Sequence, residues 1–444
     1  MNEGEYNLTK FSKALSTLSA STLLLFGATS HAQAQGMNIP FIETTEYMTG
    51  LERPWDMAFL PDGTLFFSEV CKGLSVRTPS GDVNPLYGIK DSSGYPDSGD
   101  DLFCEGQAGL LGVVADPDFA ENRTLYVYSS STKYRGDGCQ TNFDKCDGNI
   151  VMRFTVSEDL TSVSDRTDIV TDIQYKPFDS DQPFGGPGAH NGGRLRMGPD
   201  GFLWVAGGDR HMGTCPQDGQ MLCGKILRID GDGNAHPDNN PPEGFDKRIY
   251  TYGHRNVQGI DFRPSDGRAF VAEHGPWHSD EITALVNGGN GGWDPAQNVG
   301  GRGECPDEYC GYEPNQMDAM DPAIRAAYTP MSDTRFEDLM PPSWNNHGFS
   351  QGTGSAAFLT GENWGIYEGR LAAGIMGIGF GATPPGSRID VYDIADDGQS
   401  IKGAIIMPTG ITTRYRGLVM GPENALYATV DDGIIYKISA KPQQ

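Results

Sequence analysis

The sequence predicts an all-β protein, because strand-like segments follow tight turns along most of its length. Its 444 residues include 60 glycines and 29 prolines, and only 21% are charged. This composition is typical of many short strands joined by turns. One phrase recurs, in which a turn of the Pro-Asp-Gly type is followed by alternating apolar residues. Proline presets the turn, aspartate caps it and glycine accepts a positive φ. The phrase stands at residues 60–67, 116–128, 198–205, 263–271 and 421–428.

The spacing of this phrase predicts a six-bladed β-propeller. Most copies lie about 55–80 residues apart, a period that suits four-stranded blades, and one gap is about twice as long. A sixth blade with a degenerate signature, near residues 345–385, fills that gap. An array of β-sandwiches with generic turns is the alternative. In a propeller the loops at one end of the channel converge, so His190, Arg255, Gly275 and Arg414 can share one site.

The N-terminus reads as a secretory signal peptide over residues 1–34, which leaves residues 35–444 as a single propeller domain. Lys10 and Lys13 form a basic region, an apolar stretch follows, and small residues at 30–34 suit cleavage. The stretch is too short and too polar to span a membrane. We therefore expect a periplasmic or secreted protein with no membrane span in its mature form.

The net charge of −26 argues against nucleic acid and anionic membranes as partners. It suits an extracytoplasmic protein that binds calcium, although a solvated acidic surface accounts for most of the acids. The eight cysteines fall into local neighbours, which in an oxidising compartment predict disulfides. Zinc is the rival interpretation, but no Cys-x-x-Cys pair is present. The expected pairs are Cys139–Cys146, Cys215–Cys223, Cys305–Cys310 and Cys71–Cys104.

His190 is the first candidate catalytic residue. It follows the glycine-rich run GPGAHNGGRL at residues 186–195, and Asp209 ends the hairpin that comes next. Because a hairpin brings its two ends together, Asp209 can reach the imidazole. A carboxylate on one ring nitrogen fixes the tautomer and raises the basicity of the other nitrogen. The pair therefore predicts a base for a hydroxyl proton, although a lone histidine is more often structural.

Three further groups suggest a bound anion and a bound cation. Arg255 in YGHRNVQG, at residues 252–259, can stabilise developing negative charge. Arg414 and Arg416 alternate on a strand and so share a face, as a clamp for carboxylates requires. Carbonyl and carboxylate oxygens that suit calcium are offered by Gly275, Pro276, Glu281 and Gly291. The non-functional alternatives are a surface arginine for Arg255, a solvated edge strand for Arg414 and Arg416, and ordinary turns for the glycines.

These segments together resemble the soluble sugar dehydrogenases of the glucose/sorbosone dehydrogenase family, which use pyrroloquinoline quinone (PQQ) and calcium. The resemblance begins with LERPWDMAFLPDG at residues 51–63, includes AEHGPWHSDEI at 272–282 and ends with TRYRGLVMG at 413–421. It implies a six-bladed propeller that oxidises an aldose at C1 to a lactone. A separate electron acceptor (a quinone, dye or cytochrome) is implied, because no haem-attachment motif is present.

The resemblance also assigns roles to individual residues. His190 looks like the general base, supported by Asp209. The cofactor contacts would be Gln107, Arg255, Asn256, Arg414 and Arg416. Gly275 and Pro276 would give carbonyls to the calcium beside PQQ, and Glu281 and the carbonyl of Gly291 match a second, structural calcium.

One segment departs from the family pattern. The strand that normally supplies a lysine to PQQ reads LAAGIMGIGF at residues 371–380 and contains no lysine. This departure keeps a second hypothesis open, that of a non-catalytic propeller that binds a carbohydrate or a protein and has lost PQQ. A calcium-dependent lactonase is a third. The set of His190, Asp209, Arg255, Arg414 and Arg416 favours the dehydrogenase.

Overall fold

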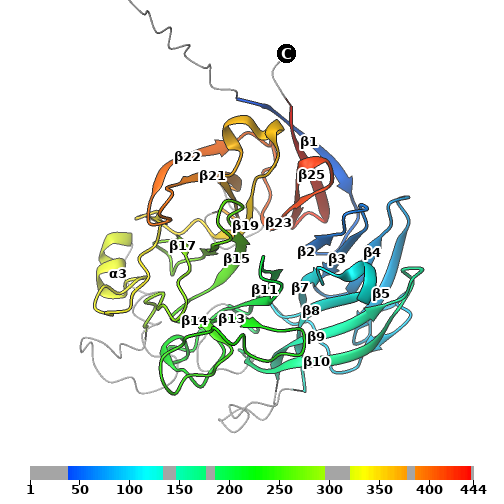
Figure 1. Ribbon diagram of the computed structural model, residues 1–444, viewed down its shortest axis with the longest axis horizontal. Helices are drawn as coiled ribbons and strands as arrows, with labels where there is room; N and C mark the ends of the chain where they lie inside the picture. The colour runs from blue at the N-terminus through cyan, green and yellow to red at the C-terminus, as the bar shows by residue number, and fades with distance from the viewer. Residues whose placement is uncertain (1–38, 134–146, 177–185, 296–320, 378–385, 442–444) are drawn as a thin grey trace, which may run out of the picture. The chain divides into compact units, whose positions relative to one another are not determined.

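The computed structural model describes residues 39–133, 147–176, 186–295, 321–377 and 386–441. These residues build six sheets arranged around a centre (Figure 1), antiparallel except for the short strand β6, which pairs with β5 in parallel, and this confirms the six-bladed β-propeller. The first three sheets contain, in chain order, β2 (Pro54–Phe59), β3 (Leu65–Glu69), β4 (Gly73–Arg77), β5 (Val83–Ile89) and β6 (Ser98–Gly99); β7 (Leu110–Ala115), β8 (Thr124–Ser131), β9 (Gly148–Val156) and β10 (Val163–Gln174); and β11 (Gly192–Met197), β12 (Leu203–Gly207), β13 (Ile226–Ile229) and β14 (Ile249–Thr251).

The other three sheets complete the ring. They contain β15 (Val257–Phe262), β16 (Ala269–Glu273), β17 (Glu281–Ala284) and β18 (Trp344–Asn345); β19 (Thr353–Phe358), β20 (Leu371–Ile375), β21 (Arg388–Ile394) and β22 (Ile401–Met407); and β23 (Tyr415–Gly421), β24 (Ala425–Val430) and β25 (Ile434–Lys441) with β1 (Phe41–Met48). Short helices α1 (Phe119–Asn122), η2 (Cys215–Gln217), α3 (Pro322–Tyr328), η3 (Glu362–Tyr367) and η4 (Pro422–Asn424) lie between strands. None of the helices in the described part of the chain is long and apolar enough to cross a membrane.

The recurring turn phrase has one structural position, between the first and second strands of a blade. It joins β2 to β3, β7 to β8, β11 to β12, β15 to β16 and β23 to β24. The degenerate sixth copy is η3, between β19 and β20. The first strands of neighbouring blades contact one another all the way around the ring, from β2 through β7, β11, β15, β19 and β23 back to β2. The phrase therefore marks the end of each innermost strand.

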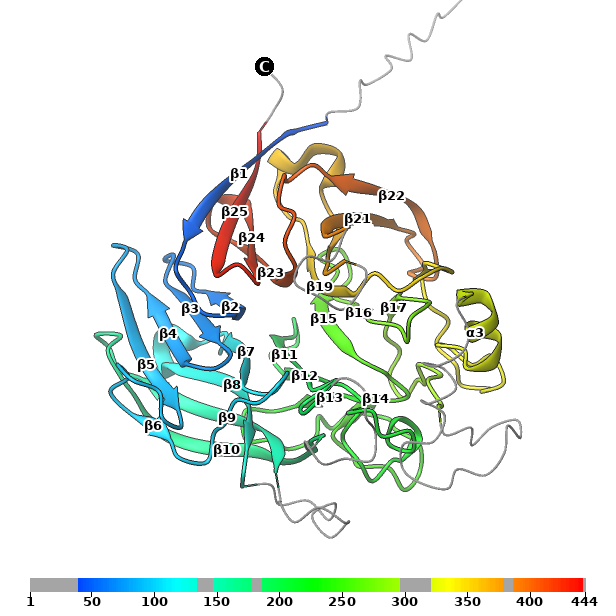
Figure 2. The ribbon, with the colours of Figure 1, turned by 180° about the vertical axis from the view of Figure 1, so that it is seen from behind.

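The ring is closed by strands from both ends of the chain. β1 pairs with β25, and β25 continues through β24 to β23 in the same sheet. Figure 2 shows β1, in blue, beside β25, in red. The N-terminal strand thus completes the blade that the C-terminal strands begin.

A buried arginine ties several inner strands together at the centre. Arg194, on β11, is fully buried and lies 2.5 Å from a carboxylate oxygen of Asp56 on β2. Its Nε donates to the Gln258 carbonyl on β15, and a terminal nitrogen donates to the Arg416 carbonyl on β23. Burial lowers the pKa of Arg194 to about 10, which leaves it charged at neutral pH. The inner strands around it are therefore fixed in position.

The cysteines agree with the disulfide prediction where they are described. Cys71–Cys104 and Cys215–Cys223 are bonded. The predicted signal peptide and the pairs Cys139–Cys146 and Cys305–Cys310 lie outside the described residues.

Candidate active site

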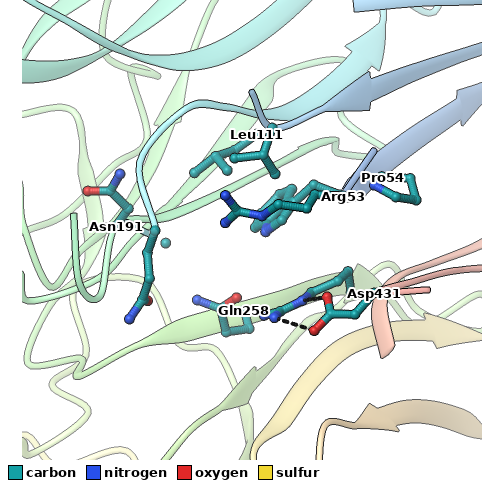
Figure 3. Close-up of a pocket in the computed structure, with 11 residues that line it drawn as sticks. Arg53, Pro54, Leu111, Asn191, Gln258 and Asp431 are labelled. Carbon is teal, nitrogen blue, oxygen red and sulfur yellow. Dashed lines mark hydrogen bonds and ion pairs between the residues drawn. The ribbon is translucent and has the colours of Figure 1, made fainter. Parts of the chain in front are cut away.

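A cavity lies where the inner strands begin. Its walls come from the starts of β2, β11 and β15, the loop before β7, and β23 with the residue after β24. Figure 3 shows Arg53, Asn191, Gln258 and Asp431 around the opening. The lining residues are Arg53, Pro54, Trp55, Val70, Gln107, Leu111, Asn191, Gly192, Gln258, Arg416 and Asp431. The sequence-predicted Gln107 and Arg416 therefore share one cavity, and His190 adjoins its wall at Asn191.

His190 and Asp209 form the predicted pair at the open end of the β11–β12 hairpin. Gly192 is opposite Gly207 in the strand register, which brings the flanking residues together. His190 Nδ1 lies 2.7 Å from Asp209 Oδ1, and both side chains are buried. Asp209 Oδ2 accepts a hydrogen bond of 2.7 Å from Trp293 Nε1. The carboxylate is thus held on the ring nitrogen that does not face a substrate.

Burial sets the protonation states of this pair. Burial first, and then Arg255, holds the pKa of His190 well below 6.5, so its imidazole is neutral. Burial raises the pKa of Asp209 to about 6, although the positive charge of Arg255 opposes the rise. At neutral pH an ionised Asp209 therefore accepts the Nδ1 proton of a neutral His190. That tautomer leaves Nε2 as a proton acceptor.

Arg255 is buried beside this pair. Its backbone N–H donates to Glu273 Oε1, and its Nη1 donates to the His274 carbonyl at 2.6 Å. Its guanidinium carbon lies 5.8 Å from the centre of the Trp293 ring. The Nε–H is buried and has no hydrogen-bond partner among the described residues. A buried donor without a partner costs free energy, so the geometry suits an acceptor oxygen at this point.

Arg414 directly precedes β23 and Arg416 is its second residue, and both contact the side chains of Asp431 and Met376. Arg416 forms a two-pronged ion pair with Asp431, drawn as dashed lines in Figure 3. Arg414 Nε is 3.6 Å from Asp431 and is buried without a hydrogen bond within the described ranges. The Met376 sulfur lies 3.3 Å from Arg416 Nη1 and 3.7 Å from Arg414 Nη2. The shared face that the sequence predicted is therefore present.

Gln107 and Asn256 hold the loops on either side of the cavity. The backbone N–H of Gln107 donates to the Pro187 carbonyl, just before His190. Asn256 is buried, its backbone N–H donates to Glu273, and its Oδ1 accepts from Gln258 Nε2 at 2.8 Å. Gln107 thus contacts the loop that precedes His190, and Asn256 contacts Gln258 in the cavity wall.

The candidate calcium ligands fall into two places. Gly275 lies in a tight turn after β16, where its carbonyl accepts from the Trp277 N–H and its N–H donates to Asp280. Pro276 follows it in the same turn. The oxygens that these two residues could offer to a cation are backbone carbonyls, and that of Gly275 already accepts a hydrogen bond. No cluster of three or more acidic, histidine or cysteine side chains able to hold a metal ion occurs in the parts of the chain that are described.

Glu281 and Gly291 lie elsewhere, away from the residues that line the cavity. Glu281, on β17, is directly opposite Glu273 on β16. Its oxygens accept hydrogen bonds from Asn345 and Ser332. Burial, followed by the charge of Glu273, raises the pKa of Glu281 to about 8. Two buried carboxylates on opposed residues repel one another, so this place suits a cation.

Sequence reasoning missed several residues that contact the predicted ones. Arg53 and Asp431 line the cavity, and His211 contacts His190. Arg53 and His211 have positive φ values of 50° and 59°, which are uncommon for residues other than glycine. The sequence signals for Arg53 and Asp431 were weak. Arg53 is a charged residue directly before a strand, and Asp431 is an aspartate directly after one. Only the ring geometry shows that they meet.

Comparison with known proteins identifies sugar dehydrogenases as relatives of this chain. The model of the glucose/sorbosone dehydrogenase family matches residues 51–437. Aldose sugar dehydrogenase YliI of Escherichia coli is 32% identical over 246 residues, 55% of this chain and 59% of that protein. Quinoprotein glucose dehydrogenase B of Acinetobacter calcoaceticus is 29% identical over 299 residues, 63% of this chain and 57% of that protein.

Solved structures agree on the fold. The PQQ-bound aldose sugar dehydrogenase of Streptomyces coelicolor has a TM-score of 0.62 and 22% identity, over 90% of this chain and 99% of that one. At this identity the likeness concerns the fold. The chain spans less than two thirds of the length of the two curated relatives that it matches. Since the family model covers most of the chain, the protein belongs to the glucose/sorbosone dehydrogenase family.

Proposed function

We propose that this protein is a PQQ- and calcium-dependent dehydrogenase that oxidises aldose sugars, or related alcohols, at C1 to lactones. The observation that carries the proposal is the buried His190–Asp209 pair beside Arg255, whose Nε–H lacks a partner in the described chain. The family membership and the quinoprotein relative support the same chemistry. PQQ, when bound, supplies a two-electron acceptor for a hydride.

The residues present fit such a cofactor. PQQ carries carboxylates and quinone oxygens, and the site offers buried donors at Arg255 and Arg414. Arg416, Gln107 and Asn256 complete the set that would hold it. The carbonyls of Gly275 and Pro276 would bind the calcium beside it, and Glu281 with the Gly291 carbonyl would bind a structural calcium.

The chain's own part in the reaction is proton transfer and positioning. His190 Nε2 accepts the proton of the C1 hydroxyl, and Asp209 stabilises the imidazolium that forms. Arg255 stabilises negative charge that develops as the hydride leaves. Electrons then pass to a separate acceptor, and the protein works in the periplasm or outside the cell, where the two described disulfides persist. The alternative of a non-catalytic propeller is not favoured, because the family model and the relatives are sugar dehydrogenases.

Reconstitution tests the proposal. The protein is stripped of metal and cofactor, PQQ and calcium are added together and separately, and dye reduction is followed with a panel of aldoses. Turnover that needs both additions and is accompanied by lactone supports the proposal. Failure of the wild-type chain to bind PQQ, or binding without turnover of any aldose or related alcohol, overturns it.

A further inference from the structure

The cavity carries more positive than negative charge, although the chain as a whole has a formal charge of −26. Its charged lining residues are Arg53, Arg416 and Asp431. Asp431 is the only carboxylate among them, and it is already engaged by the two prongs of Arg416. Arg414 lies on the same carboxylate from farther away. One acid therefore forms ion pairs with two guanidinium groups, and the excess positive charge attracts an anion.

Arg53 is the cation that this carboxylate does not neutralise. Its side chain makes no ion pair with any acid in the described chain. Instead Nη2 donates to the Gly106 carbonyl at 3.0 Å, and Nη1 lies 3.2 Å from Cys71 Sγ of the Cys71–Cys104 disulfide. Burial, followed by the charge of Arg416, lowers the pKa of Arg53. The guanidinium is thus placed over the cavity next to another cation (Figure 3).

The backbone at Arg53 supports a functional placement. Its φ of 50° is left-handed, a conformation that costs free energy for a residue with a side chain and that clusters at functional sites. The residue directly precedes β2, the innermost strand of the first blade. The turn therefore directs a long cationic side chain over the channel, at a free-energy cost that glycine would avoid.

The residue that directly follows β20 contacts both Arg414 and Arg416 but carries no charge. Met376, at the end of β20, places a neutral thioether between Arg414 and Arg416. Residues 371–380 contain no lysine, although the family pattern has one in this segment. Arg53 lines the cavity together with Arg416, the arginine that Met376 contacts.

We propose that Arg53 binds a carboxylate of PQQ and takes the place of the missing lysine. This inference rests on the proposed function, since the ligand is the cofactor of that site. Arg53 Nη1 and Nη2 each keep one N–H beyond those directed at Cys71 and Gly106, and such an N–H would donate a charge-assisted hydrogen bond to a carboxylate. The disulfide and the Gly106 carbonyl position Arg53 for this contact.

The test is PQQ affinity of the metal-loaded protein, measured by calorimetry and by quenching of tryptophan fluorescence. Arg53→Gln removes the charge and keeps a hydrogen-bonding group. Loss of a charge-assisted contact predicts a Kd roughly tenfold to a hundredfold higher, and a weaker dependence of Kd on salt. Arg53→Lys keeps the charge but loses the planar guanidinium, so its Kd should lie between those of the wild type and Arg53→Gln.

Arg77→Gln is the matched control. Arg77 ends β4 in the same blade and bonds Tyr47 Oη, away from the cavity, so its Kd should equal that of the wild type. Thermal melting without PQQ confirms that all three variants fold. Equal PQQ affinity of folded Arg53→Gln and wild type, or equal losses in Arg53→Gln and Arg77→Gln, overturns the inference while leaving the proposed function intact. No PQQ binding by the wild type contradicts the proposed function itself.

Discussion

The Nε2 atoms of His190 and His211 lie 2.8 Å apart, with their rings nearly perpendicular. Because Nδ1 of His190 donates its proton to Asp209, Nε2 of His190 accepts and His211 donates. The nitrogen that we propose as the acceptor of the hydroxyl proton is therefore already engaged. A substrate hydroxyl has to replace His211 as its partner.

His211→Gly removes this competition. A neutral hydrogen bond contributes about 1 kcal/mol, so kcat/KM should rise about fivefold, while the Kd of PQQ stays unchanged. Glycine suits the left-handed backbone at this position, where φ is 59°. Steady-state kinetics beside PQQ titration measure both effects, and a large fall in kcat would instead make His211 a donor to the reacting oxygen.

His190→Ala is expected to lower turnover by roughly two to four decades, because general base catalysis contributes about that much. PQQ binding should remain nearly intact, since the carboxylate contacts assigned above do not involve His190. Single-turnover reduction of bound PQQ separates the two quantities. Turnover near that of the wild type would rule out His190 as the base.

The rate should fall on the acid side of neutrality. The pKa of Asp209 is raised to about 6, so below that pH its carboxyl is protonated and no longer accepts the Nδ1 proton as an anion. We expect kcat/KM to decline as pH falls through about 6 in the wild type. Asp209→Asn should have a low rate without this acid limb. An identical pH profile in both proteins would show that another group controls the rate.

Calcium should stabilise the protein more at high pH than at low pH. The pKa of Glu281 is raised from 4.5 to about 8, so the folded state holds this proton more tightly than the unfolded state does. Without a cation, Glu281 therefore costs stability progressively as pH rises from about 4.5 to 8. A cation bound at Glu281 restores the stability of the folded state, by about 2.7 kcal/mol when the cation is in hundredfold excess over its Kd.

Melting curves with calcium and with chelator, at pH 6 and pH 8.5, measure this difference. The calcium-dependent rise in Tm should be larger at pH 8.5, because at pH 6 the ion must displace the Glu281 proton. Glu281→Gln should remove most of the rise at both values. A rise of the same size in this variant would place the stabilising ion elsewhere.

Met376→Lys should tighten PQQ by roughly tenfold, because it adds a cation beside Arg414 and Arg416. Without PQQ the same variant should melt at a lower temperature, since three cations then face Asp431 alone. Gly377→Lys is the comparison, because Gly377 has a φ of 93° and a side chain there strains the backbone. It should destabilise the protein without tightening PQQ. Equal affinities in Met376→Lys and wild type would contradict the placement of the cofactor's carboxylates.

Much of the fold follows from local sequence, because the turn phrase is a local signal and each copy ends an innermost strand. The pairing of His190 with Asp209 follows for the same reason, since the β11–β12 hairpin joins them. Arg53 and Asp431 could not be found in this way. They belong to the first and last blades, and their meeting depends on closure of the ring. The choice between Met376 and Gly377 also needed coordinates, because the irregular end of β20 breaks strict alternation.

Closure of the ring pairs residue 41 with residue 441 in the outermost strands of the last blade, whereas the cavity lies among the inner strands, where the first and last blades meet. Arg53 belongs to the blade on one side of it, and Arg416 and Asp431 belong to the blade that contains both chain ends. Contacts so distant in sequence form late in folding, because loop closure opposes them. The anion-binding end of the cavity is therefore assembled only once the two ends of the chain have met. An anion bound by both Arg53 and Arg416 would therefore link the first blade to the last, and it would favour the closed ring because it binds only when the two blades meet.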